Sequence, residues 1–91
     1  GDAKAQNSLG VMYFRGQGVK QDKFEAIKWY RKSAEQEYKI AQYNMGVMYE
    51  YGEVVKQDYS EALRWYRKAA KQGYKSAKER IKVIQEFMRR K

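Results

Sequence analysis

The chain contains an internal repeat, because residues 5–40 recur at residues 41–76 with 21 of 36 positions identical. The identities occur in blocks: the sequence Gly-Val-Met-Tyr at residues 10–13 returns at residues 46–49. A repeat of this length is one supersecondary unit, which buries its apolar face only by stacking on a neighbour. The repeat therefore predicts a stacked architecture, and it makes binding the default function.

The composition limits what such a chain can hold. Its 91 residues form one small domain, which buries only roughly 60–65% of the surface of the unfolded chain. It has no cysteine and no histidine, so no disulfide supports the core and the commonest metal ligands are missing. We expect no metal and no cofactor. The lack of cysteine favours a cytoplasmic location, although it is also compatible with a periplasmic or secreted protein.

The first half of each unit has the pattern of an amphipathic helix, at about residues 4–15 and again at about 40–51. Apolar residues in the first copy stand at positions 5, 9, 12 and 13, which is the spacing of one helical face. Gly10 and Gly46 lie inside these helices, where glycine costs about 1 kcal/mol relative to alanine. We therefore expect a neighbouring helix to pass too close to them for a side chain.

A turn and a capped helix complete each unit. Gly16 and Gly52 can end the first helix in the left-handed conformation at little steric cost. Asp22 and Asp58 are predicted N-caps, each followed three residues later by a glutamate that can reach back to the backbone N–H of the cap.

The second helix is expected at about residues 23–36 and 59–72. Its large aromatic residues stand among alanines, which suits close helix packing; they include Trp29 and Trp65. The last stretch, residues 75–91, has an apolar stripe on one side and polar residues on the other, as the terminal cap of a stacked array needs. We therefore predict five helices: two hairpins and a capping helix.

These positions form an ordered motif. Ala-x3-Leu-Gly-x2-Tyr, then Gly-x-Gly-Val-x-x-Asp, then Ala-x2-Trp-Tyr-x-Lys-x-Ala, at a period of 36 residues, resembles the Sel1-like repeat family, a relative of the tetratricopeptide repeats. The resemblance implies an all-α, right-handed α-solenoid and a single domain over 1–91, with repeats at 5–40 and 41–76 and a cap at 75–91. It also implies a non-enzymatic adaptor or scaffold for protein complexes, often bacterial.

Some features depart from that pattern. Glu37 stands where the second unit has Gly73, and Val54 replaces the second glycine of the turn. The first residues align with the linker that follows a unit, so we expect the chain to be a fragment of a longer array. The partner, the source and the oligomeric state stay open.

The resemblance implies that the first helices line a concave face that binds a protein or peptide. The candidate partner-binding residues lie off the core stripe of these helices, at spacings that place each set on one side. They are Asn7, Val11, Phe14, Arg15, Tyr43, Val47, Glu50 and Tyr51. Aromatic residues beside charges are typical of interaction hot spots. The alternative is that Phe14 and Tyr51 cover the edges of a thin core.

The net charge is +9, and residues 71–91 hold eight Lys or Arg against two Glu. Such a field favours acidic partners, and it could contact nucleic acid or an anionic membrane. Because Glu79 and Glu86 are interspersed and no nucleic-acid fold accompanies the charge, a solvated face explains it better. An inhibitor or immunity-type protein that blocks one partner is a third hypothesis. No apolar run is long enough to span a membrane.

No residue pattern indicates catalysis. The regular carboxylate pairs, Asp22 with Glu25 and Asp58 with Glu61, recur at two helix starts, where capping explains them. The glycine-rich turn lacks the Gly-Lys-Ser/Thr of a phosphate loop. The serines have no histidine partner, although lysine-based variants of the triad exist. We therefore expect no enzyme activity.

Overall fold

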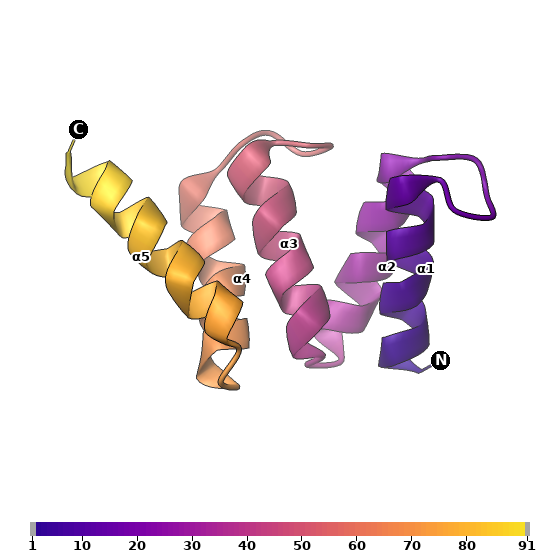
Figure 1. The fold of residues 1–91 in the computed structure, drawn as a ribbon, viewed down its shortest axis with the longest axis horizontal. Coiled ribbons are helices and arrows are strands. Elements are labelled where there is room, and N and C mark those ends of the chain that lie inside the picture. The colour runs from indigo at the N-terminus through magenta and orange to yellow at the C-terminus, as the bar shows by residue number, and fades with distance from the viewer. Residues whose placement is uncertain (1, 91) are drawn as a thin grey trace.

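The computed structural model describes residues 2–90, and within them it contains five helices and no strand. In chain order they are α1 (Ala3–Arg15), α2 (Lys23–Glu35), α3 (Lys39–Tyr51), α4 (Tyr59–Lys71) and α5 (Lys75–Arg89). The prediction of an all-α fold with two hairpins and a fifth helix is confirmed. Each helix packs mainly on its neighbours in sequence. Figure 1 shows α1, α3 and α5 on one side, with α2 and α4 behind them.

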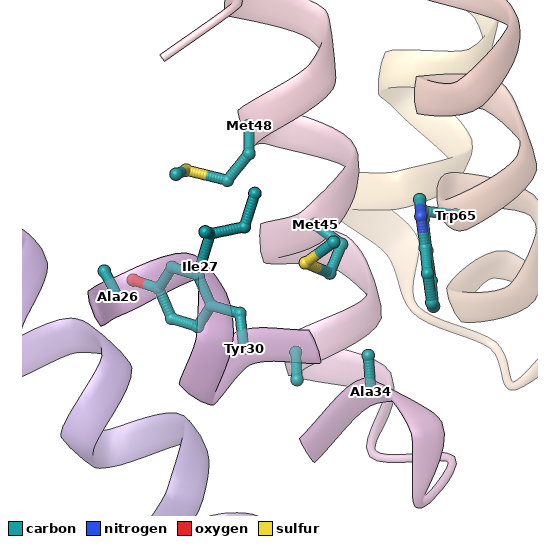
Figure 2. Packing of buried hydrophobic residues seen from close by; sticks show 8 residues of the cluster. Ala26, Ile27, Tyr30, Ala34, Met45, Met48 and Trp65 are labelled. Carbon is teal, nitrogen blue, oxygen red and sulfur yellow. The ribbon is translucent and has the colours of Figure 1, made fainter. Parts of the chain in front are cut away.

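Two small apolar clusters form the core, one for each contact between units. In the first, Met45 and Met48 of α3 reach toward Ile27 and Tyr30 of α2, while Trp65 approaches from α4 (Figure 2). The second cluster repeats the arrangement with residues of α4 and α5, namely Ala62, Leu63, Tyr66, Ala69, Ala77 and Ile84. A solenoid of this kind buries its apolar faces between successive elements rather than around one centre.

The glycines inside the first helices stand where an aromatic ring crosses them. A Cβ atom added to Gly10 would lie 2.6 Å from the ring of Tyr30, and one added to Gly46 would lie 2.5 Å from the ring of Tyr66. Real Cβ atoms essentially never approach this closely. The close approach therefore offsets the cost of glycine within a helix.

The turn within each unit is built from a left-handed glycine and an aspartate cap. Gly16 has φ 70° and Gly52 has φ 64°, while Asp22 and Asp58 each accept a hydrogen bond of 3.1 Å from the backbone N–H three residues later. The second half of the predicted capping box is wrong. The N–H of Asp22 donates instead to the Tyr13 carbonyl at 2.9 Å, and that of Asp58 donates to the Tyr49 carbonyl at 3.0 Å.

The two departures from the repeat pattern have different outcomes. Glu37 adopts φ 65°, close to the φ of 86° at Gly73, so the turn between units keeps its shape despite the side chain. Gly18 has φ 75°, whereas Val54 has no positive φ and packs against the first core cluster. The second turn thus has an apolar contact, made by Val54, where the first turn has a left-handed glycine.

The two tryptophans occupy different environments. Trp65 is buried in the first core cluster, between the two units. Trp29 is only half-buried, because within residues 2–90 no helix precedes α1. The repeat therefore places equivalent residues in unequal surroundings, depending on whether a described neighbour covers them.

Candidate interaction groove between α1 and α3

A groove of about 170 Å³ lies between the first helices of the two units. Four of the predicted partner-binding residues line it, and they are Val11, Phe14, Arg15 and Val47. Three further lining residues were not predicted: Tyr30, Asn44 and Met48. The groove thus has an apolar lining with one cation, one amide and one phenol. We call it the α1/α3 groove.

Asn7 and Tyr43 have structural contacts. Asn7 is buried, and its Oδ1 accepts a hydrogen bond of 3.0 Å from the Asn44 amide, which connects α1 to α3. Tyr43 packs on the rings of Tyr66 and Tyr74, with centroids 5.4 Å and 5.2 Å away. Neither residue lines the α1/α3 groove.

Glu50 differs from the expectation of an open surface residue. It is only 5% exposed, and its Oε1 accepts hydrogen bonds from the Tyr66 hydroxyl at 2.7 Å and from Nε of Arg80 at 3.2 Å. Arg80 also pairs with the other carboxylate oxygen. A buried carboxylate requires such partners, so Glu50 joins α3 to α4 and α5. Its neighbour Tyr51 is 58% exposed and lies outside the groove.

Two polar groups of the α1/α3 groove have no partner of their own within residues 2–90. The Tyr30 hydroxyl makes no hydrogen bond, and Arg15 makes no hydrogen bond or ion pair. Tyr30 is 4% exposed, and burial raises its pKa to about 12, although the nearby positive charge of Arg15 partly opposes that shift. The hydroxyl therefore keeps its proton at neutral pH and can donate a hydrogen bond.

Phe14 covers the edge of the core, and it also lies at the α1/α3 groove. Its ring packs against the first core cluster, and Lys23 Nζ lies 5.1 Å from the ring centroid, in the range of a cation–π contact. The same side chain lines the α1/α3 groove. It therefore covers a core edge and also forms part of a candidate binding surface.

Two of the three missed residues come from positions that the sequence assigned to helix packing. Met48 belongs to the apolar stripe of α3, and Tyr30 comes from α2, in the other layer. Asn44 carried a usable signal, since the aligned position in the first unit is Ser8. Divergence between the copies was therefore a signal that could have identified Asn44, whereas the contact across α1 and α3 had no local signal.

The rest of the described chain offers little other chemistry. The regular carboxylates act as caps and surface ion pairs: Glu25 pairs with Lys28, and Glu61 pairs with Arg64. Within residues 2–90, no group of three His, Cys, Asp or Glu side chains is placed to hold a metal ion. None of the helices in that range is both long and apolar enough to cross a membrane.

Comparison with known proteins agrees with this architecture. The model of the Sel1 repeat family matches residues 3–38 and 39–74, which together make up most of the chain. The chain belongs to the Sel1 repeat family. Sel1 repeat proteins are generally protein-interaction modules, and the repeat is a non-catalytic protein-interaction fold.

Two solved structures show the same fold. The Sel1 repeat protein from Oxalobacter formigenes superposes with a TM-score of 0.85 at 40% identity, over 87% of this chain and 32% of that one. A protective antigen of uropathogenic Escherichia coli, with an SLR fold, gives 0.90 at 44% identity, over 92% of this chain and 18% of that one.

A curated relative matches a shorter segment of this chain. A Sel1-like repeat-containing protein of Acanthamoeba polyphaga mimivirus is 51% identical over 39 residues, which are 43% of this chain and 7% of that protein. This Sel1 chain therefore spans less than a third of the length of each of these three relatives.

Proposed function

We propose that this Sel1 repeat chain is a non-enzymatic interaction module that receives a segment of a partner protein in the α1/α3 groove. The observation that supports this best is the groove itself, where Val11, Phe14, Arg15 and Val47 come together from two repeats. An apolar surface with a few polar groups is typical of binding sites. The family's role in protein interactions supports the same function.

The basic α5 surface is the competing site, and its charges are partly neutralised. Arg80 pairs with Glu50, while Arg89 and Arg90 both pair with Glu86. A surface that binds phosphates leaves its cations available to them. These ion pairs therefore favour the groove over a nucleic-acid or membrane surface.

The test is site-specific photocrosslinking in cells that make the protein. A benzophenone amino acid replaces Val47 in the groove, and in two control proteins it replaces Arg67 on α4 or Lys82 on α5. All three positions lie outside the fully buried core. We expect crosslinks to a discrete protein from position 47 alone. Crosslinks from position 82 alone, or recovery of nucleic acid, would contradict the proposal.

Salt dependence provides an independent measurement on the captured complex. Binding through phosphates weakens steeply and linearly in log–log form as salt rises, by several powers of ten for 6–10 contacts. A mainly apolar groove with a single cation loses much less. The double variant Lys78→Glu with Lys82→Glu should therefore leave capture unchanged, whereas Val47→Asp should abolish it.

A further inference from the structure

The contact between α3 and α5 is the equivalent, one repeat later, of the contact between α1 and α3. The residues 36 positions after the lining of the α1/α3 groove are Val47, Glu50, Tyr51, Tyr66, Arg80, Val83 and Ile84, and of these Glu50, Val83 and Ile84 line a cavity of about 150 Å³. The carboxylate of Glu50 lies among these side chains, 2.7 Å from the Tyr66 hydroxyl and 3.2 Å from Nε of Arg80. The second repeat therefore supplies its own acceptor for the tyrosine hydroxyl, which is the side chain of Glu50.

The first repeat has the same phenol but lacks the carboxylate. Tyr30 stands where the second repeat has Tyr66, and each ring lies across a helical glycine. Phe14 stands at the position of Glu50, so no acidic residue lines the α1/α3 groove. The hydroxyl of Tyr30 is thus left without the acceptor that the hydroxyl of Tyr66 has.

The positive charge of the first repeat comes from a different residue. Asn44 stands at the position of Arg80, and Arg15, at the position of Tyr51, supplies a cation from α1 instead. Arg15 is exposed and makes no ion pair within residues 2–90. The α1/α3 groove therefore contains a hydrogen-bond donor and a cation, but no carboxylate that accepts from them as Glu50 does in the second repeat.

We propose that the α1/α3 groove binds the side-chain carboxylate of a glutamate in an acidic segment of a partner protein. The Tyr30 hydroxyl donates to that carboxylate and Arg15 pairs with it, as Tyr66 and Arg80 do for Glu50. This inference rests on the proposed function and names the chemistry of the partner. The net charge of +9 complements such a segment and speeds its encounter with the chain.

The size and the apolar lining of the groove agree with a single side chain. Its volume of about 170 Å³ lies below the roughly 300–1,000 Å³ of pockets for small-molecule ligands. Val11, Phe14, Val47 and Met48 provide the apolar walls, which fit the methylene groups of a glutamate. Because Tyr30 is only 4% exposed, a hydrogen bond from its hydroxyl is stronger than one made in water.

A tethered carboxylate tests the polar part of the site without any partner. Phe14→Glu introduces a carboxyl at the position equivalent to Glu50. We expect its pKa, measured by NMR titration, to fall below the ordinary value of about 4.3 and to return toward it when Arg15→Gln or Tyr30→Phe is added. A pKa at or above the ordinary value, unchanged by these additions, would overturn the inference.

A peptide selection tests the site with an external ligand. This second test does not depend on whether the Phe14→Glu variant folds. The whole chain is screened against random dodecapeptides displayed with both ends blocked by flanking sequence. We expect selected peptides to contain a glutamate. Its replacement by glutamine should weaken binding about 10- to 100-fold, as for a hydrogen bond to a charged group. The same loss is expected for Arg15→Gln and Tyr30→Phe, but not for the matched exposed control Arg67→Gln.

The outcomes separate this inference from the proposed function. Peptides that bind the groove without needing glutamate would overturn the inference and leave the groove as a docking site. Enrichment only from a library with free C-termini would assign the site to a terminal carboxylate, and would also overturn it. If no peptide is selected, or if none of the groove variants changes binding, the proposed function fails as well.

Discussion

Replacing Gly46 by alanine tests whether the close approach of α3 and α4 governs stability. At an open helical position this change stabilises a protein by about 1 kcal/mol, because alanine is the better helix former. At Gly46 the new Cβ would lie 2.5 Å from two carbons of the Tyr66 ring and 2.9 Å from a third. Tyr66 is fully buried, and Glu50 holds its hydroxyl at 2.7 Å, so the ring cannot turn aside freely.

The expected magnitude follows from these contacts. Overpacking costs about 1–3 kcal/mol, and a weakened hydrogen bond to the Glu50 carboxylate adds up to about 1.5–3 kcal/mol. After the gain in helix propensity is subtracted, we expect Gly46→Ala to lower the free energy of unfolding by about 2–4 kcal/mol. Gly46→Leu should lower it further. Urea unfolding followed by circular dichroism measures the change, with an unchanged slope as the check that the unfolded state is the same.

Gly10→Ala provides the matched control. Its Cβ would lie 2.6 Å from the Tyr30 ring, but the Tyr30 hydroxyl has no partner within residues 2–90 and the ring borders the α1/α3 groove. The ring of Tyr30 can therefore shift, and we expect a loss of only about 1 kcal/mol. If Gly46→Ala stabilises the protein, or if the two substitutions cost the same, the reasoning from ring fixation is refuted.

Three further predictions follow from the backbone and the buried polar groups. Arg80→Met leaves the Glu50 carboxylate buried without its cation and should cost about 2–3 kcal/mol in urea unfolding; adding Glu50→Gln should recover much of that loss. Glu37→Gly should raise the free energy of unfolding by about 0.5–1 kcal/mol, and with it the thermal midpoint, because glycine adopts the left-handed conformation without strain. Gly73→Ala, whose new Cβ would meet no atom within 4 Å, should lower both for purely conformational reasons. Burial and the bond to Glu50 raise the pKa of Tyr66 above its ordinary value. The contribution of the protonated hydroxyl to the free energy of unfolding is therefore fully present below about pH 10 and is lost as the pH rises further. Tyr66→Phe should flatten that decline in an alkaline titration.

Most of the fold was predictable because its signals are local and occur twice. The helix starts at Asp22 and Asp58 and the turn glycines Gly16 and Gly52 lie within a few residues of the structure that they define. The apolar spacing of α1 and α3 likewise depends on one helical period. The predicted helix bounds consequently differ from the observed ones by only a residue or two, apart from the last helix, where residue 91 lies outside the described range.

The errors in the local predictions also have physical causes. The capping box was expected from spacing alone, but the N–H of Asp22 faces the Tyr13 carbonyl at the end of α1, and a donor already used needs no glutamate. The departure from glycine at Glu37 left the tightness of the turn between units open. Glu37 accepts the left-handed conformation, and its own carbonyl receives a hydrogen bond of 2.9 Å from the Gln72 amide of the next unit.

The candidate site was only partly predictable, because its chemistry depends on contacts between units. Position 50 was correctly assigned to α3, yet nothing near it in sequence shows that Arg80, 30 residues later, neutralises its charge. Tyr30 was assigned to helix packing, and its hydroxyl became a candidate donor only when the α1/α3 groove was seen to open onto it. The spacing of residues along one helix predicts which of them share a face. A groove also depends on the neighbouring helix and on the residue beneath, here α3 and Tyr30, which the spacing within α1 does not predict.

Comparison of the two repeats separates framework from groove. The framework repeats in detail: the Gln36 amide donates to Gln6 at 2.6 Å as the Gln72 amide does to Gln42 at 2.9 Å. A further side-chain bond recurs at 2.8 Å, from Gln21 to the carbonyl of residue 14 and from Gln57 to that of residue 50.

The same residue 14 and residue 50, which supply equivalent carbonyls to this framework, differ in their side chains. One is Phe14, which lines the α1/α3 groove, and the other is Glu50, which accepts a hydrogen bond from the Tyr66 hydroxyl. Because the backbone there is fixed by the repeated bonds, the side chain can change without moving the helices. That independence allows one repeat to satisfy its buried tyrosine internally through Glu50, while the other leaves Tyr30 and Arg15 available to a carboxylate from outside.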